Sequence, residues 1–414
     1  MQSGWFARLF FAVVGVLAVA ALMSGTACTR WGQPGPVTPT IAPLPPIFVD
    51  PVKGSDSSGN GSQSKPYKTL TKAMSVFLAA KQVTSAFVIN LEPGSYTAAN
   101  GEIFPIVVPK NVTIKGFAYG HGPQAGTFIN GAGEDTIFEK LVHASPHTAY
   151  TTLEVLPPAM VGFSNIYVGA AKFSPPGSNS FYASLDAIGS TNASDSTFGV
   201  AILPRVNNLD GVLVAGGAFS CTSCLIRGND FGIGALTVPL PTASPYATGP
   251  SIVLAHGDAD STIVARVFDI ITDGSVSLNV SGEKFAKAQY AFSDSFSPVV
   301  PVPVRGAVDF GGGVTVSPGE NAFIGALRTE INIVRRNESV YALDDVWNPR
   351  EQGANRNGSY SHRIIFDSMS APGKNVTIAH DATGSTVTVG PAPVPTPSSS
   401  ASPSAPPTST PTPK

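Results

Sequence analysis

The stretch AHGDADSTIVAR contains the carboxylates that are best spaced for chemistry. His256, Asp258 and Asp260 alternate along the chain, so on an extended strand they would share one face, with Arg266 further on. Two carboxylates beside a cation suit acid–base chemistry or calcium binding. Gly257 in the middle favours a turn instead, in which the Asp side chains accept hydrogen bonds from nearby amides. We expect the turn and keep the catalytic interpretation as the alternative.

A second group of polar residues surrounds a tryptophan near the end of the patterned chain. Its members are Arg335, Arg336, Asp344, Asp345 and Trp347. An exposed tryptophan flanked by charges can stack on a sugar ring while the charged groups bind its hydroxyls. The competing interpretation, which we favour, is that Trp347 covers the last layer of a core and that the charges face solvent.

The elements that must position these residues are short strands. Runs such as NVTIKG, SNIYVG, SIVLAH and VSLNVS alternate apolar and small polar residues and end in Gly, Asn or Ser, which is typical of strands. The pentapeptide Lys-Asn-Val-Thr-Ile occurs at 110–114 and again at 374–378. One core-facing residue per unit recurs at intervals of 24 to 32 residues: Ile166, Phe198, Ile226, Leu254, Leu278, Val308 and Ile333.

This spacing is typical of a solenoid in which each coil holds about three short strands. We predict an all-β fold over residues 47–390, a right-handed parallel β-helix with a short N-terminal capping helix. A β-sandwich is the competing fold, but it favours about 8 to 12 residues per strand and a smaller domain.

A single amphipathic helix is predicted at 69–82, where it would close the open end of the solenoid. Pro66 and Thr69 signal its start, and Lys72 and Lys81 should face outward. The expected buried stripe is Leu70, Ala73, Met74, Phe77 and Leu78.

The loop before this helix is rich in turn chemistry. Asp50, Ser55 and Asp56 can accept hydrogen bonds from turn amides. Gly54, Gly59 and Gly61 allow the chain to bend there. We expect Asp56, and Glu102 further along, to have structural roles.

The two ends of the chain predict export. Residues 1–27 resemble a secretory signal, with Arg8 before an apolar run and small residues before Cys28. SGTAC resembles a bacterial lipobox, in which Cys28 would carry the lipid anchor; cleavage with release, or a retained membrane helix, are the alternatives. Residues 28–46 are expected to form a Pro-rich spacer and residues 391–414 a disordered Pro/Ser/Thr-rich tail.

Composition narrows the classes of partner. Charged residues make up 13% and the formal net charge is −2, so the chain has no basic footprint for nucleic acid. Cys221 and Cys224 either form a local disulfide or pack as two small apolar side chains, and two thiols alone make a poor metal site.

Several motifs near the predicted cap resemble a known family. They are VDP at 49–51, GSD at 54–56, PYKT at 66–69, EPGSY at 92–96, GEIFPI at 101–106 and VTIKG at 112–116. In order and spacing they resemble the secreted family called domain of unknown function 1565, which is similar to pectin-lyase-like parallel β-helices. The resemblance implies fold and export, and it supplies no catalytic residue.

Together these features favour an exported, cell-surface β-helix that binds or scaffolds an extracellular polymer, most plausibly polysaccharide. A polysaccharide lyase or glycoside hydrolase is the first alternative, with Ca²⁺ as cofactor if a lyase; a structural envelope protein without ligand is the second. We expect a monomer with no metal site, held at the membrane through a lipid anchor if Cys28 is modified.

Overall fold

The structure is a computed structural model. It describes residues 45–79, 86–117, 126–144, 148–170, 173, 176–177, 179–199, 209–239, 250–255, 262–273, 275–286, 288–295, 308–311, 317, 320–324, 329–332, 339–342, 346–347, 376–379 and 386–389. None of the helices in these ranges combines the length and the apolar character that a membrane span requires.

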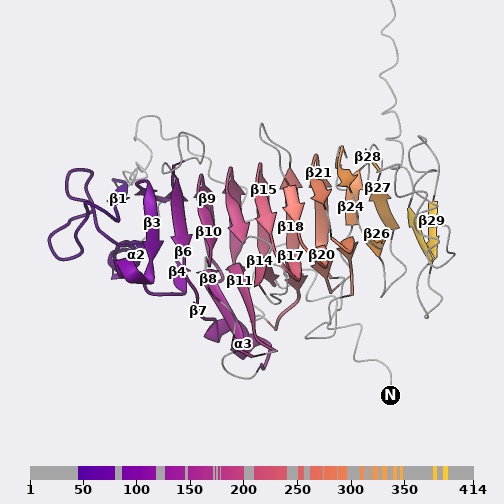
Figure 1. Ribbon diagram of the computed structural model, residues 1–414, viewed down its shortest axis with the longest axis horizontal. Helices are drawn as coiled ribbons and strands as arrows, with labels where there is room; N and C mark the ends of the chain where they lie inside the picture. The colour runs from indigo at the N-terminus through magenta and orange to yellow at the C-terminus, as the bar shows by residue number, and fades with distance from the viewer. Residues whose placement is uncertain are drawn as a thin grey trace, which may run out of the picture. The chain divides into compact units, whose positions relative to one another are not determined.

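The described strands form three sheets that the chain visits in turn (Figure 1). Sheet 1 contains, in spatial order, β1 (Ile47–Val49), β2 (Phe87–Leu91), β5 (Val112–Lys115), β9 (Met160–Ser164), β12 (Ser190–Ser194), β15 (Ala218–Thr222), β18 (Ser251–Ala255), β21 (Ser277–Ser281), β24 (Val308–Gly311), β27 (Ser339–Ala342), β30 (Thr386–Val389) and β29 (Val376–Ala379).

Sheet 2 contains β3 (Gly94–Thr97), β6 (Thr127–Asn130), β10 (Tyr167–Gly169), β13 (Thr197–Gly199), β16 (Leu225–Arg227), β19 (Thr262–Val264), β22 (Lys284–Ala286), β25 (Ala322–Ile324) and β28 (Val346–Trp347). Sheet 3 contains β4 (Ile106–Val108), β8 (Ala149–Val155), β11 (Phe181–Ala187), β14 (Leu209–Ala215), β17 (Phe231–Leu236), β20 (Phe268–Thr272), β23 (Tyr290–Ser293) and β26 (Thr329–Asn332), with the short β7 (Gly133–Glu134) antiparallel to β8.

Each coil therefore places one strand in each sheet, and strands of successive coils pair in parallel. In sheet 1, for example, Thr191 pairs with Phe219, which pairs with Ile252 of the next coil. The side chains of all three point inward and are buried. The fold is a right-handed parallel β-helix, as the spacing predicts.

The one-per-coil residues taken from the sequence do not all belong to one ladder. Phe198 and Ile226 are register partners in sheet 2. Leu278 and Val308 are partners in sheet 1, and Leu254 pairs there with Val280. The predicted series thus changes sheets between coils, because each coil holds several inward positions only a few residues apart. Ile333 lies outside the described residues.

A two-residue turn joins sheet 1 to sheet 2 in several coils. Its first residue has a positive φ in three of them: Asn165 at 55°, Asp195 at 48° and Ser223 at 57°. Polar residues tolerate this left-handed conformation better than branched ones. Cys221 of β15 and Cys224, the second residue of the third turn, form a disulfide, which decides between the two alternatives for this pair.

The predicted capping helix is α2 (Leu70–Ala79). Leu70, Ala73, Met74 and Phe77 are buried in the core cluster, as the stripe predicts. Leu78 is 61% exposed, so its prediction was wrong. Val76 packs against the core in its place, because the covered face of this short helix is rotated toward Val76.

Side chains from neighbouring loops hold the start of α2. The Thr69 hydroxyl accepts a hydrogen bond from the Lys72 amide at 3.0 Å. Asp56 accepts hydrogen bonds from the amides of Lys68 and Thr69 at 2.8 and 3.0 Å. Glu102 accepts one from the Leu70 amide at 2.7 Å. The structural roles predicted for Asp56 and Glu102 are therefore confirmed.

The two copies of Lys-Asn-Val-Thr-Ile end in different settings. The first leads into β5, which pairs in parallel with its neighbours. The second leads into β29, which pairs antiparallel with β30 at the end of the sheet 1 order. The repeated sequence thus specifies a strand but not its direction.

Candidate functional site

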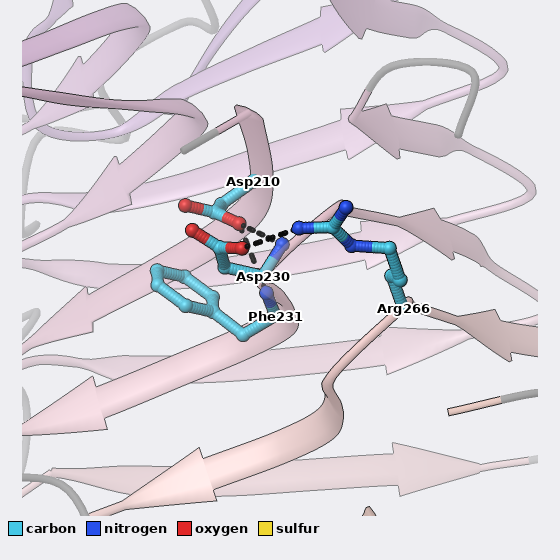
Figure 2. Close-up of polar contacts among 4 residues, drawn as sticks. All are labelled: Asp210, Asp230, Phe231 and Arg266. Atoms are coloured by element: carbon cyan, nitrogen blue, oxygen red, sulfur yellow. Dashed lines mark hydrogen bonds and ion pairs between the residues drawn. The ribbon is translucent and has the colours of Figure 1, made fainter. Parts of the chain in front are cut away.

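Of the first predicted site, the structure describes only the arginine. His256, Asp258 and Asp260 lie outside the described residues. Arg266 Nη2 lies 3.5 Å from Asp230 Oδ1, and the two side chains are 37% and 32% exposed. Figure 2 shows this pair at the corner that leads into β17. A half-exposed ion pair of this kind contributes little to stability, about 0 to 1 kcal/mol.

The carboxylate beside this pair has a structural explanation. Asp210 Oδ1 accepts hydrogen bonds from the amides of Asp230 and Phe231, both at 2.9 Å (Figure 2). Burial raises the pKa of Asp210 well above its usual range, and the bonds from the Phe231 and Asp230 amides offset part of that rise. These contacts connect β14 to the start of β17, which explains Asp210 without a catalytic role.

The second predicted site is described only in part. Arg335, Arg336, Asp344 and Asp345 lie outside the described residues. The backbone of Trp347 belongs to β28 and pairs with Phe323 of β25. The position of its side chain is not described, so both interpretations of Trp347 stay predictions.

A groove of about 300 Å³ lies on the outward face of sheet 2. Aromatic residues form part of its lining. Phe128 of β6 and Tyr167 of β10 are register partners whose ring centroids are 5.6 Å apart at an interplanar angle of 53°. Phe117 also lines the groove and is 49% exposed. Aromatic side chains on an outward face would normally be covered, so this group marks a surface that can bind a ligand.

A glycine makes room for the tyrosine ring. An added Cβ at Gly169 would lie 3.1 Å from Tyr167 Cε1 and 2.5 Å from the Gly199 carbonyl oxygen. The ring therefore occupies space that a side chain at position 169 would fill. Its position is fixed by the strand rather than by a loop, which favours a preformed site.

Polar groups lie at the edge of the groove and at its far end. Asn165 and Asp195, both in the tight turns, line it on one side, and Arg227 at the end of β16 lines it on another. Burial raises the pKa of Tyr167, and the positive charge of Arg227 opposes that rise, which places the guanidinium near the tyrosine hydroxyl. No acidic side chain among the described residues lies within ion-pair distance of Arg227.

The outward face of sheet 2 continues beyond the groove. Register partners of Tyr167 in the following coils are Thr197, Leu225, Thr262 and Lys284. Within the described strands β6 to β22, this face carries two cations, Arg227 and Lys284, and no carboxylate. The face therefore combines aromatic rings, hydroxyl groups and positive charge.

The residues that line this groove were not predicted from the sequence as site residues. Among the described residues, no group of three or more His, Cys, Asp or Glu side chains could hold a metal ion. The groove is our candidate site, and its chemistry is that of binding: ring faces, hydrogen-bonding groups, one arginine and the carboxyl group of Asp195.

Three solved structures are similar to the chain at low identity. A pectin methylesterase from Aspergillus niger is 14% identical over 70% of this chain and 86% of its own, with a TM-score of 0.30. A GH136 lacto-N-biosidase from Eubacterium ramulus is 10% identical over 73% and 65%, with a TM-score of 0.35. A pectin methylesterase in complex with a hexasaccharide is 10% identical over 77% and 99%, with a TM-score of 0.32.

No curated protein sequence matches the chain. A family model does match its N-terminal part, and the match includes nearly all of the motifs between residues 49 and 116. The resemblance that these motifs predict is therefore confirmed: residues 52–169 match the family described as "Protein of unknown function (DUF1565)".

Proposed function

We propose that the protein is an exported, cell-surface binder of an extended polysaccharide that carries acidic groups, and that the glycan lies along the outward face of sheet 2. The observation that carries this proposal is the pair Phe128 and Tyr167 in the groove beside Arg227. Sugar rings have apolar C–H faces that pack on aromatic rings, while their hydroxyl groups need hydrogen-bonding partners.

The cations on the same face support an acidic glycan. Arg227 has no ion-pair partner among the described residues, and a guanidinium binds a carboxylate through two parallel hydrogen bonds. Lys284 lies two strands further along sheet 2 than Arg227. With about 4.8 Å per strand, the two strands are roughly 10 Å apart, which is comparable to the length of two linked sugar units.

The ends of the chain support a location where such a polymer occurs. The signal-like residues 1–27 and Cys28 predict export and lipid anchoring, and the Pro-rich stretch at 28–46 would act as a spacer. Residues 1–44 lie outside the described residues, so export remains part of the proposal. Mass spectrometry of the mature N-terminus tests it, because a lipid on Cys28 supports anchoring and a free N-terminus elsewhere supports release.

The binding proposal is tested with two matched arginine variants of the mature chain. Arg227→Gln should weaken the affinity for a polyuronate oligosaccharide by about 10- to 100-fold, because a hydrogen bond to a charged group contributes about 1.5 to 3 kcal/mol. Arg266→Gln removes an arginine of similar exposure outside the groove and should leave the Kd unchanged. Isothermal titration calorimetry gives both values, and circular dichroism checks that both variants fold.

Other outcomes of the same assay would favour the alternatives. Equal affinities for wild type and Arg227→Gln would contradict the proposed site. Calcium-dependent release of unsaturated products that is lost in Asp258→Ala or Asp260→Ala would favour a lyase. Neither binding nor turnover across acidic and neutral glycans would favour a structural envelope protein.

A further inference from the structure

Three carboxyl groups lie together on the outward side of sheet 3, beneath the short helix α3 (Thr136–Leu141). Glu154 of β8 and Asp186 of β11 are register partners, and Asp135 is the N-cap residue of α3. The exposed fractions of Asp135, Glu154 and Asp186 are 2%, 2% and 0%. We call these three residues the carboxyl cluster. Bulk water does not reach it.

Three of the six oxygens of the cluster lack an N–H or hydroxyl donor. Asp135 Oδ1 accepts a hydrogen bond from the Phe138 amide at 2.9 Å. Neither oxygen of Asp186 has such a donor, nor does Oε1 of Glu154. The carboxyl of Asp135 instead contacts those of Asp186 and Glu154 at hydrogen-bond distance. A hydrogen bond between two carboxyl groups requires a proton on one of them, so the folded cluster holds protons.

The surrounding charges do not neutralise the cluster. The described titratable groups on the elements packed against it are Glu134 of β7, Glu139 and Lys140 of α3, His143 after α3, Tyr150 of β8, Tyr182 of β11 and Asp210 of β14. None of the described basic side chains lies within ion-pair distance of a cluster carboxyl. Glu139 adds negative charge, and its own carboxylate accepts hydrogen bonds from the amides of Thr148 and Ala149.

The cluster lies where α3 attaches to the sheet. Phe138 of α3 packs edge to face against Phe181 of β11, with ring centroids 5.6 Å apart. It belongs to an apolar cluster that includes Ala183, Leu213 and Ala215 of the sheet. Helix α3 therefore covers an apolar outward face, and ionised carboxyls beneath it would repel one another without solvation.

We propose that the carboxyl cluster is a pH-sensitive latch, in which shared protons hold α3 on sheet 3 near neutral pH and alkaline pH releases the helix and uncovers the apolar face. This inference is independent of the glycan site.

The direction of the pH effect follows from the proton affinity of the folded state. Burial, followed by the charge of Asp135, raises the pKa of Glu154 from 4.5 to about 8, and burial also raises those of Asp135 and Asp186. The docked state therefore binds protons more tightly than an exposed state. The stabilisation of the docked state by the Glu154 proton is full below about pH 4.5 and falls as the pH rises to about 8. For Glu154 alone, docking should weaken roughly 100-fold between about pH 6 and about pH 9.

Hydrogen exchange of the full mature chain tests the latch. In wild type, peptides covering 136–144 and 181–187 should lose protection between about pH 6 and about pH 9, after correction for the intrinsic exchange rate. Glu154→Gln supplies a permanent donor without a charge and should flatten this pH dependence. Glu139→Gln removes a neighbouring charge that raises the pKa of Asp135, so it should keep the pH dependence with its midpoint moved to slightly lower pH, whereas Glu154→Gln should flatten it.

Infrared spectroscopy of wild type gives a second readout that does not depend on any variant folding. A protonated-carboxyl band should be present at neutral pH and should disappear as the protection of α3 falls. Absence of that band at neutral pH would overturn the proposal. Equal pH dependence in wild type and in folded Glu154→Gln would also overturn it.

Discussion

Replacing Glu102 tests how the N-terminal cap is held. Glu102 is 4% exposed, and its Oε1 accepts a hydrogen bond from the Leu70 amide at 2.7 Å. Its Oε2 accepts hydrogen bonds from the Thr71 amide at 2.8 Å and from the Thr71 hydroxyl at 2.6 Å. These amides belong to the first turn of α2, where no helical carbonyl can accept their hydrogen bonds. Glu102→Ala leaves the Leu70 amide, the Thr71 amide and the Thr71 hydroxyl without this acceptor in an environment that is largely shielded from water.

The expected cost can be worked from these contacts. Each hydrogen bond to a charged acceptor contributes about 1.5 to 3 kcal/mol, but burial raises the pKa of Glu102, so the carboxylate pays a desolvation cost that offsets part of the gain. Because the three bonds share one group, they do not add fully. We expect Glu102→Ala to lower the free energy of unfolding by about 3 kcal/mol.

Urea unfolding followed by circular dichroism measures this loss, and hydrogen exchange should show that it begins at α2. Glu92→Ala is the matched control, because the Glu92 carboxylate accepts no hydrogen bond among the described residues; it should change stability by less than about 0.5 kcal/mol. A Glu102→Ala variant as stable as Glu92→Ala would refute the idea that this carboxylate holds the cap.

Three further changes probe the coils and the loop. Replacing Cys221 and Cys224 together by Ser should cost about 2 kcal/mol in thermal unfolding, because the disulfide closes only a short loop; no loss would contradict that role. Phe310→Ala removes a ring that contacts three other phenylalanines, so urea unfolding should show a free energy of unfolding lower by about 4 kcal/mol. A loss below about 1 kcal/mol would show that the surrounding core collapses into the cavity. Gly61→Ala should lower the free energy of unfolding by about 1 to 2 kcal/mol in calorimetry, since φ is +78° and the new Cβ would lie 2.8 Å from the Tyr67 ring. An unchanged melting temperature would mean that the loop relaxes to accommodate the alanine.

Sequence reasoning succeeded where the physical signal is local. The period of α2 predicted four of its five buried positions, and only Leu78, at the edge of the stripe, was wrong. The Asp56 and Glu102 side chains were correctly assigned to structural roles, because both lie in turn-rich segments, where carboxylates commonly accept hydrogen bonds from amides. The strands were predicted because alternation is visible within five residues.

The groove was missed because its residues are far apart in the sequence. Phe128 and Tyr167 become neighbours only through the register of β6 and β10. A signal does exist: SNIYVG at 164–169, SDSTFG at 194–199 and TSCLIR at 222–227 each contain the tight turn followed by a strand of sheet 2. Aligning these hexapeptides by their left-handed turn residue places Tyr167, Thr197 and Leu225 in one outward row, as in the structure.

The carboxyl cluster was missed for a different reason. In TTLEV and SLDAI, Glu154 and Asp186 occupy the outward positions of alternating strands, where acids normally face solvent. In the structure both are buried beside Asp135, the N-cap residue of α3, which lies in a separate segment of the chain. Periodicity predicts the side of a strand on which a residue lies, but it does not predict what covers that side.

The central claim is that a glycan stacks on the aromatic rings of sheet 2, and a pair of tyrosine variants tests it most directly. Calorimetric titration of an acidic oligosaccharide should show that Tyr167→Ala weakens its binding by about 2- to 10-fold, because an aromatic contact contributes about 0.5 to 1.5 kcal/mol beyond the area it buries. Tyr290 of β23 stacks on Phe268 in sheet 3, away from the groove, so Tyr290→Ala should bind as wild type does. Undiminished binding by folded Tyr167→Ala, or an equal loss in both variants, would contradict the account.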